Sequence, residues 1–239
     1  DIYENYIEWA AKWLDEAYRV LSKNGSMVIF GGIQFRDVKS GDLIDIIHHV
    51  RNNTKFKLIN TIIWRYKNGM SAHRYFANRH EEVIWLTKSN DYYFDLDAVR
   101  EPYKKKDLKA ALKDKRLNPE NTMKGKNPTN VWEINRLNGN SKERVGHPTQ
   151  KPVEIIDRFV KALSYPGSVV LDFFAGSGTV GRVCITEGRH CLICDSDPTT
   201  LEYFKKHLEL MKGLGQEAEY IEVDNVEDFF NAEQKGEEQ

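Results

Sequence analysis

The stretch from residue 168 to residue 198 constrains the fold of this chain more than any other. It reads SVVLDFFAGSGTVGRVCITEGRHCLICDSDP. An apolar run at residues 169–171 ends at Asp172, a glycine-rich turn and a short helical pattern follow, and a second apolar run at residues 191–194 ends at Asp195. This order predicts a strand, a tight loop, a helix and a second strand, with an acidic residue at the end of each strand.

The same stretch predicts a ligand site. Gly176 and Gly178 let the backbone turn sharply and let a ligand come close to the main chain. The free N–H groups that open the following helix favour a negative group. Asp195, at the tip of the second strand, is placed to accept hydrogen bonds from a ribose diol. We therefore expect an adenosine-containing cofactor across the carboxyl ends of two parallel strands.

Two cofactors of this kind compete. Gly176, Gly178 and Gly181 form a G-x-G-x-x-G pattern, and Asp195 follows at about the 20 residues typical of a dinucleotide site. Asp172 argues against a dinucleotide, because a carboxylate beside the loop would repel a pyrophosphate but would suit an ammonium group. S-adenosylmethionine carries an ammonium and a sulfonium group and no phosphate. We favour S-adenosylmethionine, and a NAD-dependent oxidoreductase is the alternative from another class.

Two motifs resemble those of a known family. The octapeptide DFFAGSGT at residues 172–179 resembles the cofactor loop of amino-group DNA methyltransferases, and HPTQKP at residues 147–152 is similar to a motif of their β class. The resemblance covers nearly the whole chain. It implies an α/β fold with a doubly wound, mostly parallel, Rossmann-like sheet and an inserted, irregular target-recognition segment. It also implies a set of cofactor-binding residues: Thr149, Gln150, Lys151, Asp172, Phe173, Phe174, Ala175, Gly176, Ser177, Gly178, Thr179 and Asp195.

The chain departs from that family at one point. The catalytic tetrapeptide of the family is Asp, Asn or Ser followed by Pro-Pro-Tyr or Pro-Pro-Phe, and it does not occur in these 239 residues. We therefore assign no catalytic residue. The catalytic loop is expected upstream of Asp1, on a second chain, or absent altogether, and we favour the first of these. A sheet that lacks a central strand should expose apolar edges.

Charge is spread unevenly along the chain, although the net charge is −1. Residues 100–151 hold 14 Lys and Arg against 6 Asp and Glu, a net of +8, while residues 187–239 hold 5 against 14, a net of −9. A basic middle in a nearly neutral protein indicates one face that meets a polyanion. With the resemblance, this implies methyl transfer to the exocyclic amine of a base flipped out of double-stranded DNA. Adenine N6 is favoured; cytosine N4 and a non-catalytic DNA-binding subunit are alternatives.

Two segments carry the predicted contacts to DNA. The basic loop, residues 65–80, has cations interleaved with aromatic residues and contains no acidic residue, which suits phosphates and unstacked bases. Residues 101–142 begin with a run that could form a basic helix and continue with Asn, Gly and Pro, which predict a loop. The predicted DNA-binding residues are Arg65, Lys67, His73, Arg74, Tyr75, Arg79, His80, Lys104, Lys105, Lys106, Lys113, Lys115 and Arg116.

The expected organisation has four parts. Residues 1–100 form the catalytic half, residues 101–146 the target-recognition segment, residues 147–232 the cofactor-binding half and residues 233–239 a flexible tail. Strands are expected at residues 27–30, 56–64 and 82–87, with residues 92–94 extending a hairpin with the last of these. An amphipathic helix is expected at residues 152–163.

Other sequence features bear on the cellular location of the protein and on metal binding. No apolar run approaches the ~20 residues of a membrane span, and no secretory signal opens the chain. Three cysteines indicate a reducing compartment. Cys191 and Cys194 would point to opposite faces of a strand, so we expect no metal site. We expect a cytoplasmic protein that is prokaryotic, phage-encoded or nucleoid-associated. A second copy of the chain and a cognate restriction subunit are the candidate partners besides DNA.

Overall fold

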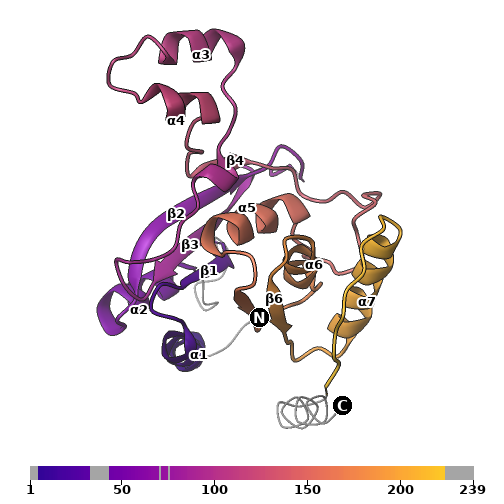
Figure 1. Cartoon of the computed structure of the whole chain (residues 1–239). Coiled ribbons are helices and arrows are strands. Elements are labelled where there is room, and N and C mark those ends of the chain that lie inside the picture. The colour runs from indigo at the N-terminus through magenta and orange to yellow at the C-terminus, as the bar shows by residue number, and fades with distance from the viewer. Residues whose placement is uncertain (1–4, 33–42, 70, 75, 224–239) are drawn as a thin grey trace, which may run out of the picture.

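A computed structural model describes residues 5–32, 43–69, 71–74 and 76–223 (Figure 1). The α-helices are α1 (Tyr6–Val20), α2 (Leu43–Asn53), α3 (Lys105–Ala111), α4 (Pro119–Lys124), α5 (Val153–Leu163), α6 (Thr179–Thr186) and α7 (Thr199–Lys212), and a 3-10 turn, η1, spans Asp97–Val99. The strands are β1 (Ser26–Gly31), β2 (Lys57–Arg65), β3 (His80–Thr87), β4 (Val131–Glu133), β5 (Val169–Asp172) and β6 (His190–Ile193). The tail predicted at residues 233–239 lies outside the described residues.

The larger sheet has the strand order β1-β3-β2-β4. β3 pairs antiparallel with both β1 and β2, from Ser26 opposite Thr87 at one end to Arg65 opposite His80 at the other. β4 pairs parallel with β2. Three strands therefore run one way and β3 runs against them. The α/β class is confirmed, and the larger sheet is mixed, because β2 returns to β3 through a loop and not through a crossover helix.

The smaller sheet contains β5 and β6, which pair in parallel from Val169 opposite His190 to Asp172 opposite Ile193. This is the strand–loop–helix–strand unit that the sequence predicts. Val169 and Leu171 of β5 are 66% and 46% exposed, which is unusual for a parallel strand. Among the described residues, β1 and β5 each have a hydrogen-bonded neighbour on one side only. The expectation of exposed apolar edges is confirmed at β5.

One helix packs against both sheets. α5 buries Ile155, Ile156, Phe159 and Val160 in a cluster that takes in Trp64 of β2, Trp85 of β3 and Val183 of α6. The rings of Phe159 and Phe30 of β1 lie 5.7 Å apart, and Val170 of β5 packs on the same cluster. The amphipathic pattern of residues 152–163 predicts this helix correctly. Figure 1 shows α5 between the four-stranded sheet and α6.

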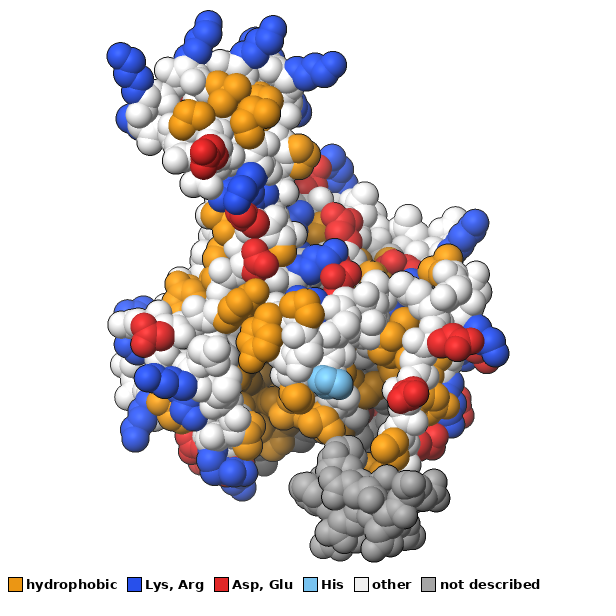
Figure 2. Space-filling model, in the orientation of Figure 1, with side chains coloured by type: hydrophobic (Ala, Val, Ile, Leu, Met, Phe, Trp, Pro, Cys, Tyr) orange, Lys and Arg blue, Asp and Glu red, His pale blue; other side chains and the backbone are white. Residues whose placement is uncertain are grey.

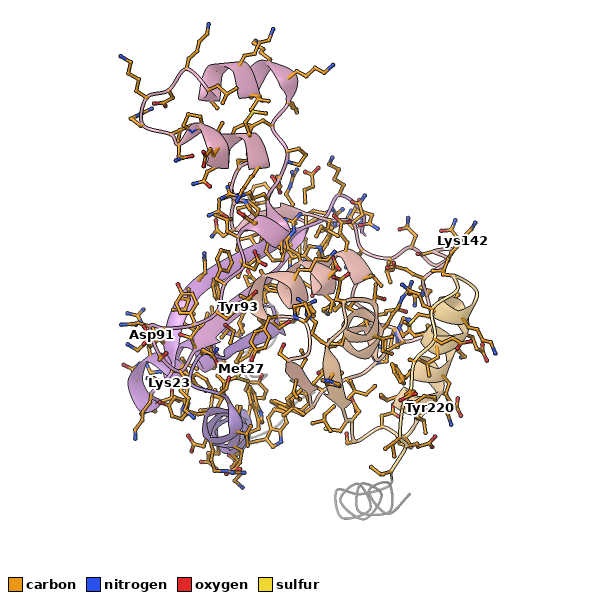
Figure 3. All side chains as sticks on the ribbon, viewed as in Figure 1. Lys23, Met27, Asp91, Tyr93, Lys142 and Tyr220 are labelled. Carbon is orange, nitrogen blue, oxygen red and sulfur yellow. The ribbon has the colours of Figure 1, made fainter. Side chains whose placement is uncertain are left out.

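Residues 92–94 do not form the expected hairpin strand. The Tyr93 N–H donates to the Asn24 carbonyl at 2.9 Å, and the Ser89 hydroxyl donates to the Lys23 carbonyl. The segment therefore caps the turn before β1, where Figure 3 places Tyr93 and Asp91 near Lys23. Tyr92 and Phe94 pack on Trp85 instead of alternating across a sheet. The prediction was wrong because aromatic packing and loop hydrogen bonds satisfy these residues without a ladder.

The central segment is more ordered than the sequence indicates. Its α3 and α4 form a lobe, residues 104–125, that stands away from the body in Figure 1. Backbone bonds between Glu101 and Lys126 close its neck, and Arg158 of α5 lies 3.5 Å from Glu101. After the lobe, β4 joins the main sheet through Trp132, so the expectation that the Asn-, Gly- and Pro-rich part of residues 101–142 forms only a loop is wrong. Burial of this large ring outweighs the local Asn, Gly and Pro preferences.

Helix α7 buries an unusual imidazole. His207 is fully buried, and among the described residues neither of its ring nitrogens has a hydrogen-bond partner. Burial lowers the pKa of His207 to about 4, and the Arg182 guanidinium on α6 adds to this effect. The folded protein therefore holds His207 neutral in the range where the unfolded chain takes up a proton.

We predict that His207 makes the fold acid-sensitive. Between its unfolded pKa of ~6.5 and its folded pKa of about 4, only the unfolded state binds the proton, so the stability falls as the pH falls. The decrease should reach about 3 kcal/mol near pH 4. In His207→Leu, urea denaturation between pH 7 and pH 4.5 should show a flatter decline than in the wild type. Equal slopes in the two proteins would contradict this assignment.

Candidate functional site

Two carboxyl groups flank the glycine loop, residues 173–178. The Gly176 N–H donates to Oδ2 of Asp195 at 2.8 Å, and the Asp197 N–H donates to Oδ1 of Asp195 at 3.0 Å. Asp172 accepts the Phe174 N–H at 3.2 Å. Because β5 and β6 are adjacent and parallel, both acids lie at the same edge of their sheet. The site predicted from the strand ends is therefore brought together.

The charge state of Asp172 is unusual. Burial raises the pKa of the Asp172 carboxyl, and the neighbouring Asp195 carboxylate adds to the rise. Within the described residues, no lysine or arginine forms an ion pair with Asp172. A cationic ligand group at this position would stabilise the ionised carboxylate.

The loop turns into α6 through two glycines in the left-handed region. Gly176 has a φ of +48° and Gly178 a φ of +75°. A Cβ on Gly178 would lie 3.0 Å from two side-chain carbons of Phe204 on α7, and one on Gly176 would lie 3.2 Å from the His147 ring. Glycine is thus needed at these two positions for two reasons: the backbone conformation is left-handed, and other side chains of the protein pack closely against the loop. The Ser177 and Thr179 hydroxyls bond each other at 2.9 Å behind the loop.

The HPTQKP motif packs against the loop from the other side. His147, which is not among the predicted site residues, covers Gly176 and packs edge-on against Tyr203. Its Nδ1 accepts the Thr149 N–H at 3.3 Å. Burial lowers the pKa of the His147 imidazole. The sequence could have pointed to His147 as a site residue, because His147 belongs to the same HPTQKP motif as the predicted Thr149.

Gln150 and Lys151 of the motif have other partners. The Gln150 side chain is buried, donates to the Glu143 carbonyl at 2.7 Å and accepts the Val145 N–H at 2.9 Å. Its contribution to the site is therefore to fix the loop that carries His147. The Lys151 carbonyl accepts the Thr179 hydroxyl at 3.4 Å.

Lys151 connects the glycine loop to the other half of the chain. Its ammonium lies 3.3 Å from the Glu81 carboxylate at the start of β3 and 5.8 Å from the ring centroids of Phe30 and Trp64. Through Lys151, the end of the basic loop lies close to the start of α6. The two segments for which ligands are predicted therefore share one region of the protein.

Aromatic residues of α1 cover the outer side of the glycine loop. The Trp13 ring lies 5.9 Å from Phe173 and 5.7 Å from Phe174, and the Trp9 ring lies 5.8 Å from Phe174. The apolar stripe of α1 fits any buried face, so the sequence offers no reason to place this helix against the loop.

The base of the basic loop is firmly held. The Tyr66 N–H donates to the Arg79 carbonyl at 2.9 Å, and the Asn68 side chain bonds the backbone of Arg136 in both directions, at 2.8 and 3.1 Å. The Arg136 guanidinium lies over the Tyr66 ring at 5.0 Å. The two ends of this loop are therefore bonded to each other and to the segment that follows β4.

The predicted DNA-binding cations differ in how far they are already paired. Arg65 and Lys67 both bind Glu133, and the contact with Lys67 lowers the pKa of the Glu133 carboxyl. His80 lies 3.0 Å from Glu82, and Arg79 bonds the Gly69 carbonyl. His73 and Arg74 are exposed, and Tyr75 lies outside the described residues.

The lobe carries the other predicted cations. Arg116 pairs with Asp114 at 2.7 Å. In the described part of the chain, no ion pair is found for the remaining five, which are exposed: Lys104, Lys105, Lys106, Lys113 and Lys115. Figure 2 shows Lys and Arg side chains spread over the outer end of the lobe. This distribution produces a positive potential away from the glycine loop.

The described residues offer neither a metal site nor a membrane span. Among them, no group of three or more His, Cys, Asp or Glu side chains could hold a metal ion. No helix in the described ranges has the length and apolar character needed to cross a membrane.

Comparison with known proteins supplies the family. A profile described as DNA methylase, of the N6/N4 type, matches residues 1–206. The chain belongs to this DNA methylase family. It is 32% identical over 209 residues to the Type II methyltransferase M.HpaI of Haemophilus parainfluenzae, covering 87% of this chain and 60% of that protein. It is 32% identical over 189 residues to the DNA adenine methyltransferase YhdJ of Escherichia coli (strain K12), covering 77% and 60%.

Solved structures show the same fold. PvuII DNA methyltransferase (cytosine-N4-specific) aligns with a TM-score of 0.64 at 16% identity, covering 95% of this chain and 74% of that one. M1.HpyAVI in complex with S-adenosylmethionine aligns with a TM-score of 0.57 at 23% identity, covering 82% and 80%. The family and fold implied by the two sequence motifs are therefore confirmed. The chain spans about 60% of the length of the curated relatives named here.

We predict that packing, and not only backbone conformation, requires glycine at residue 178. Gly178→Ala introduces both a strained φ and a clash with Phe204, whereas Gly188→Ala, at a φ of +68° with nothing within 4 Å of the new Cβ, introduces strain alone. Strain should cost about 1 kcal/mol in either variant. The clash should add about 1–3 kcal/mol in Gly178→Ala. Equal decreases of unfolding free energy in urea would show that the Phe204 contact is unimportant.

Proposed function

We propose that this chain is the larger part of an enzyme that transfers a methyl group from S-adenosylmethionine to the exocyclic amine of a flipped DNA base. The observation that carries the proposal is the pair of acids, Asp172 and Asp195, at adjacent ends of parallel strands with the glycine loop between them. Family membership supports it. Such an enzyme would work in the cytoplasm, beside the nucleoid of a prokaryote or of a phage-infected cell.

The residues around the glycine loop fit the proposed cofactor. When bound, S-adenosylmethionine supplies an electrophilic methyl group on a sulfonium centre. Asp172, whose pKa is raised by burial, would accept hydrogen bonds from its ammonium group. Asp195 keeps the loop in place through Gly176 and has lone pairs left for the ribose hydroxyls.

The remaining predicted residues complete the cofactor side. Thr149, Gln150 and Lys151 would position the loop against His147 and against β3, as their contacts indicate. Phe173 and Phe174, packed on the tryptophans of α1, would support the loop on that side. In this arrangement the residues around the loop would orient the cofactor. Correct orientation of the bound reactant lowers the activation barrier of methyl transfer.

The proposed acceptor is an amine of double-stranded DNA. A base inside the duplex is out of reach of the methyl group and must be flipped, at a cost of a few kcal/mol. We favour adenine N6 over cytosine N4 because YhdJ, which is named as an adenine methyltransferase, is 32% identical to this chain, whereas the cytosine-N4-specific PvuII enzyme is 16% identical. A second copy of the chain or a restriction subunit is a further candidate partner.

We propose that the groups that grip the amine lie outside these 239 residues. The Pro-Pro-aromatic tetrapeptide of the family is absent from them. Among the described residues, β1 and β5 pair on one side only and Val169 and Leu171 are exposed, as expected if another strand lies between the two sheets. The chain would then have three main parts. These are a catalytic half at residues 1–100, a DNA-recognition segment at residues 101–146 and a cofactor half at residues 147–232.

The direct test is methyl transfer. A protein of the length of the relatives, supplied with S-adenosylmethionine labelled on the methyl group, should label mixed-sequence DNA. After digestion the label should run as N6-methyladenine. Residues 1–239 alone should bind S-adenosylmethionine in calorimetry but leave the DNA unlabelled, since without orientation of the amine up to ~7–11 kcal/mol of barrier reduction is missing.

Three results would count against the proposal. Label in C5-methylcytosine would exclude amine chemistry, and binding of NAD without binding of S-adenosylmethionine would favour the oxidoreductase. Robust labelling by residues 1–239 alone would place the amine-binding groups inside this chain. Label in N4-methylcytosine would correct only the base.

We predict that the lobe lysines contact DNA phosphates. Replacing Lys105, Lys113 and Lys115 with Gln should reduce the slope of log affinity against log salt by about 0.9 for each phosphate that the protein no longer neutralises. The matched control replaces Lys12, Lys205 and Lys212, exposed lysines of α1 and α7, with the same net change of charge. In anisotropy titrations, the slope should decrease more in the lobe variant than in the control. Similar slopes would mean that the lobe is only a solvated surface.

A further inference from the structure

Phe76 is the most exposed large hydrophobic residue that the structure describes. It lies in the basic loop and its side chain is 100% exposed. The next values among the described large hydrophobic residues are 71% for Leu214 and 66% for Val169. Single exposed apolar residues are common on proteins, but most keep part of their surface against a neighbour. A phenyl ring held entirely in water is costly unless it acquires a partner.

The loop that carries Phe76 is held rigidly at its base and exposed farther out. The Tyr66–Arg79 backbone bond closes it, and Arg79 reaches across to the Gly69 carbonyl at 3.2 Å. Asn68 ties it to residues 136 and 138. Phe76 thus lies in a loop whose base is held by hydrogen bonds, and not at a free chain end.

The surroundings of Phe76 suit a polyanion. His73 and Arg74 precede it and are exposed, and residues 65–80 contain no acidic side chain. An exposed aromatic ring between cations matches a site where the cations meet phosphates and the ring meets bases. A protein partner would more often meet a wider apolar patch.

The loop also lies close to the proposed reaction. Glu81 follows it directly and contacts Lys151 at 3.3 Å, and the Lys151 carbonyl accepts the Thr179 hydroxyl at the start of α6. A duplex that rests on the basic loop would therefore lie beside the glycine loop, where the flipped base must arrive.

We propose that Phe76 enters the base stack of bound DNA and fills the space that the flipped base leaves. This rests on the proposed methyl transfer to a flipped base and assigns a positioning residue for that step. An apolar ring stacked between the neighbouring base pairs replaces the stacking that flipping removes, and it blocks the return of the base. Phe76 does not touch the reacting amine.

The test uses a duplex in which the space already exists. Full-length protein is titrated by anisotropy with mixed-sequence duplexes that are either intact or carry one tetrahydrofuran abasic site. Wild type should bind the abasic duplex about tenfold more tightly, because the ring enters without displacing a base. Phe76→Ala should bind both duplexes alike, and Phe76→Trp should keep the preference. The control Leu214→Ala should behave as wild type, and Arg74→Gln should weaken both duplexes by the same factor.

The outcomes separate this inference from the proposed function. A preference that persists in Phe76→Ala, or no preference in the wild type, would overturn the role of Phe76 even if the protein methylates DNA. If the wild type neither binds DNA nor transfers a methyl group to it, the proposed function fails first. Circular dichroism of Phe76→Ala should match the wild type, since an exposed ring adds nothing to the core.

Discussion

The packing of α5 against both sheets is the contact that holds the two halves of the chain in place. Phe159 meets Phe30 of β1 and, at 4.6 Å, the Trp132 ring of β4, while Val170 of β5 joins the same cluster. Among the described residues, no hydrogen bond joins a strand of one sheet to a strand of the other. Apolar burial, worth about 1.5–3 kcal/mol for each large side chain, is therefore the main interaction between the sheets.

That packing also determines the chemistry of the site. Because α5 follows HPTQKP directly, its position fixes His147 over Gly176 and places Lys151 between Glu81 and Thr179. At the ends of the paired strands β5 and β6, Asp172 and Asp195 lie near each other, and burial, together with the Asp195 carboxylate, raises the pKa of the Asp172 carboxyl. A protein does not keep such a pair for stability, since like charges repel and burial penalises the Asp172 carboxylate. It is consistent with a site prepared for a cation.

We propose that the lobe and the basic loop form the DNA-binding region of the chain, on a different physical basis from the cofactor site. Most of their predicted cations are exposed, so they would act through long-range potential and phosphate contacts, which salt weakens. Arg65, Lys67 and Arg116 are partly neutralised by acids of their own chain. Their contribution to DNA binding should therefore be smaller than that of the lobe lysines, although composition alone counts all of them equally.

Local sequence was enough to predict the strand–loop–helix–strand unit, its two acids, the glycines and the amphipathic α5, because these depend on periodicity and on backbone conformations that only certain residues adopt. The family also followed from two short motifs. The direction of β3, the addition of β4 through Trp132, the burial of His207 and the placing of α1 on the glycine loop emerge only in the folded chain. Each of these follows from contacts between residues far apart in the chain, for which neighbouring residues carry no signal. The ion pair between Lys151 and Glu81 could not be predicted for the same reason, because these two charged residues are far apart in the sequence and meet only in the folded chain.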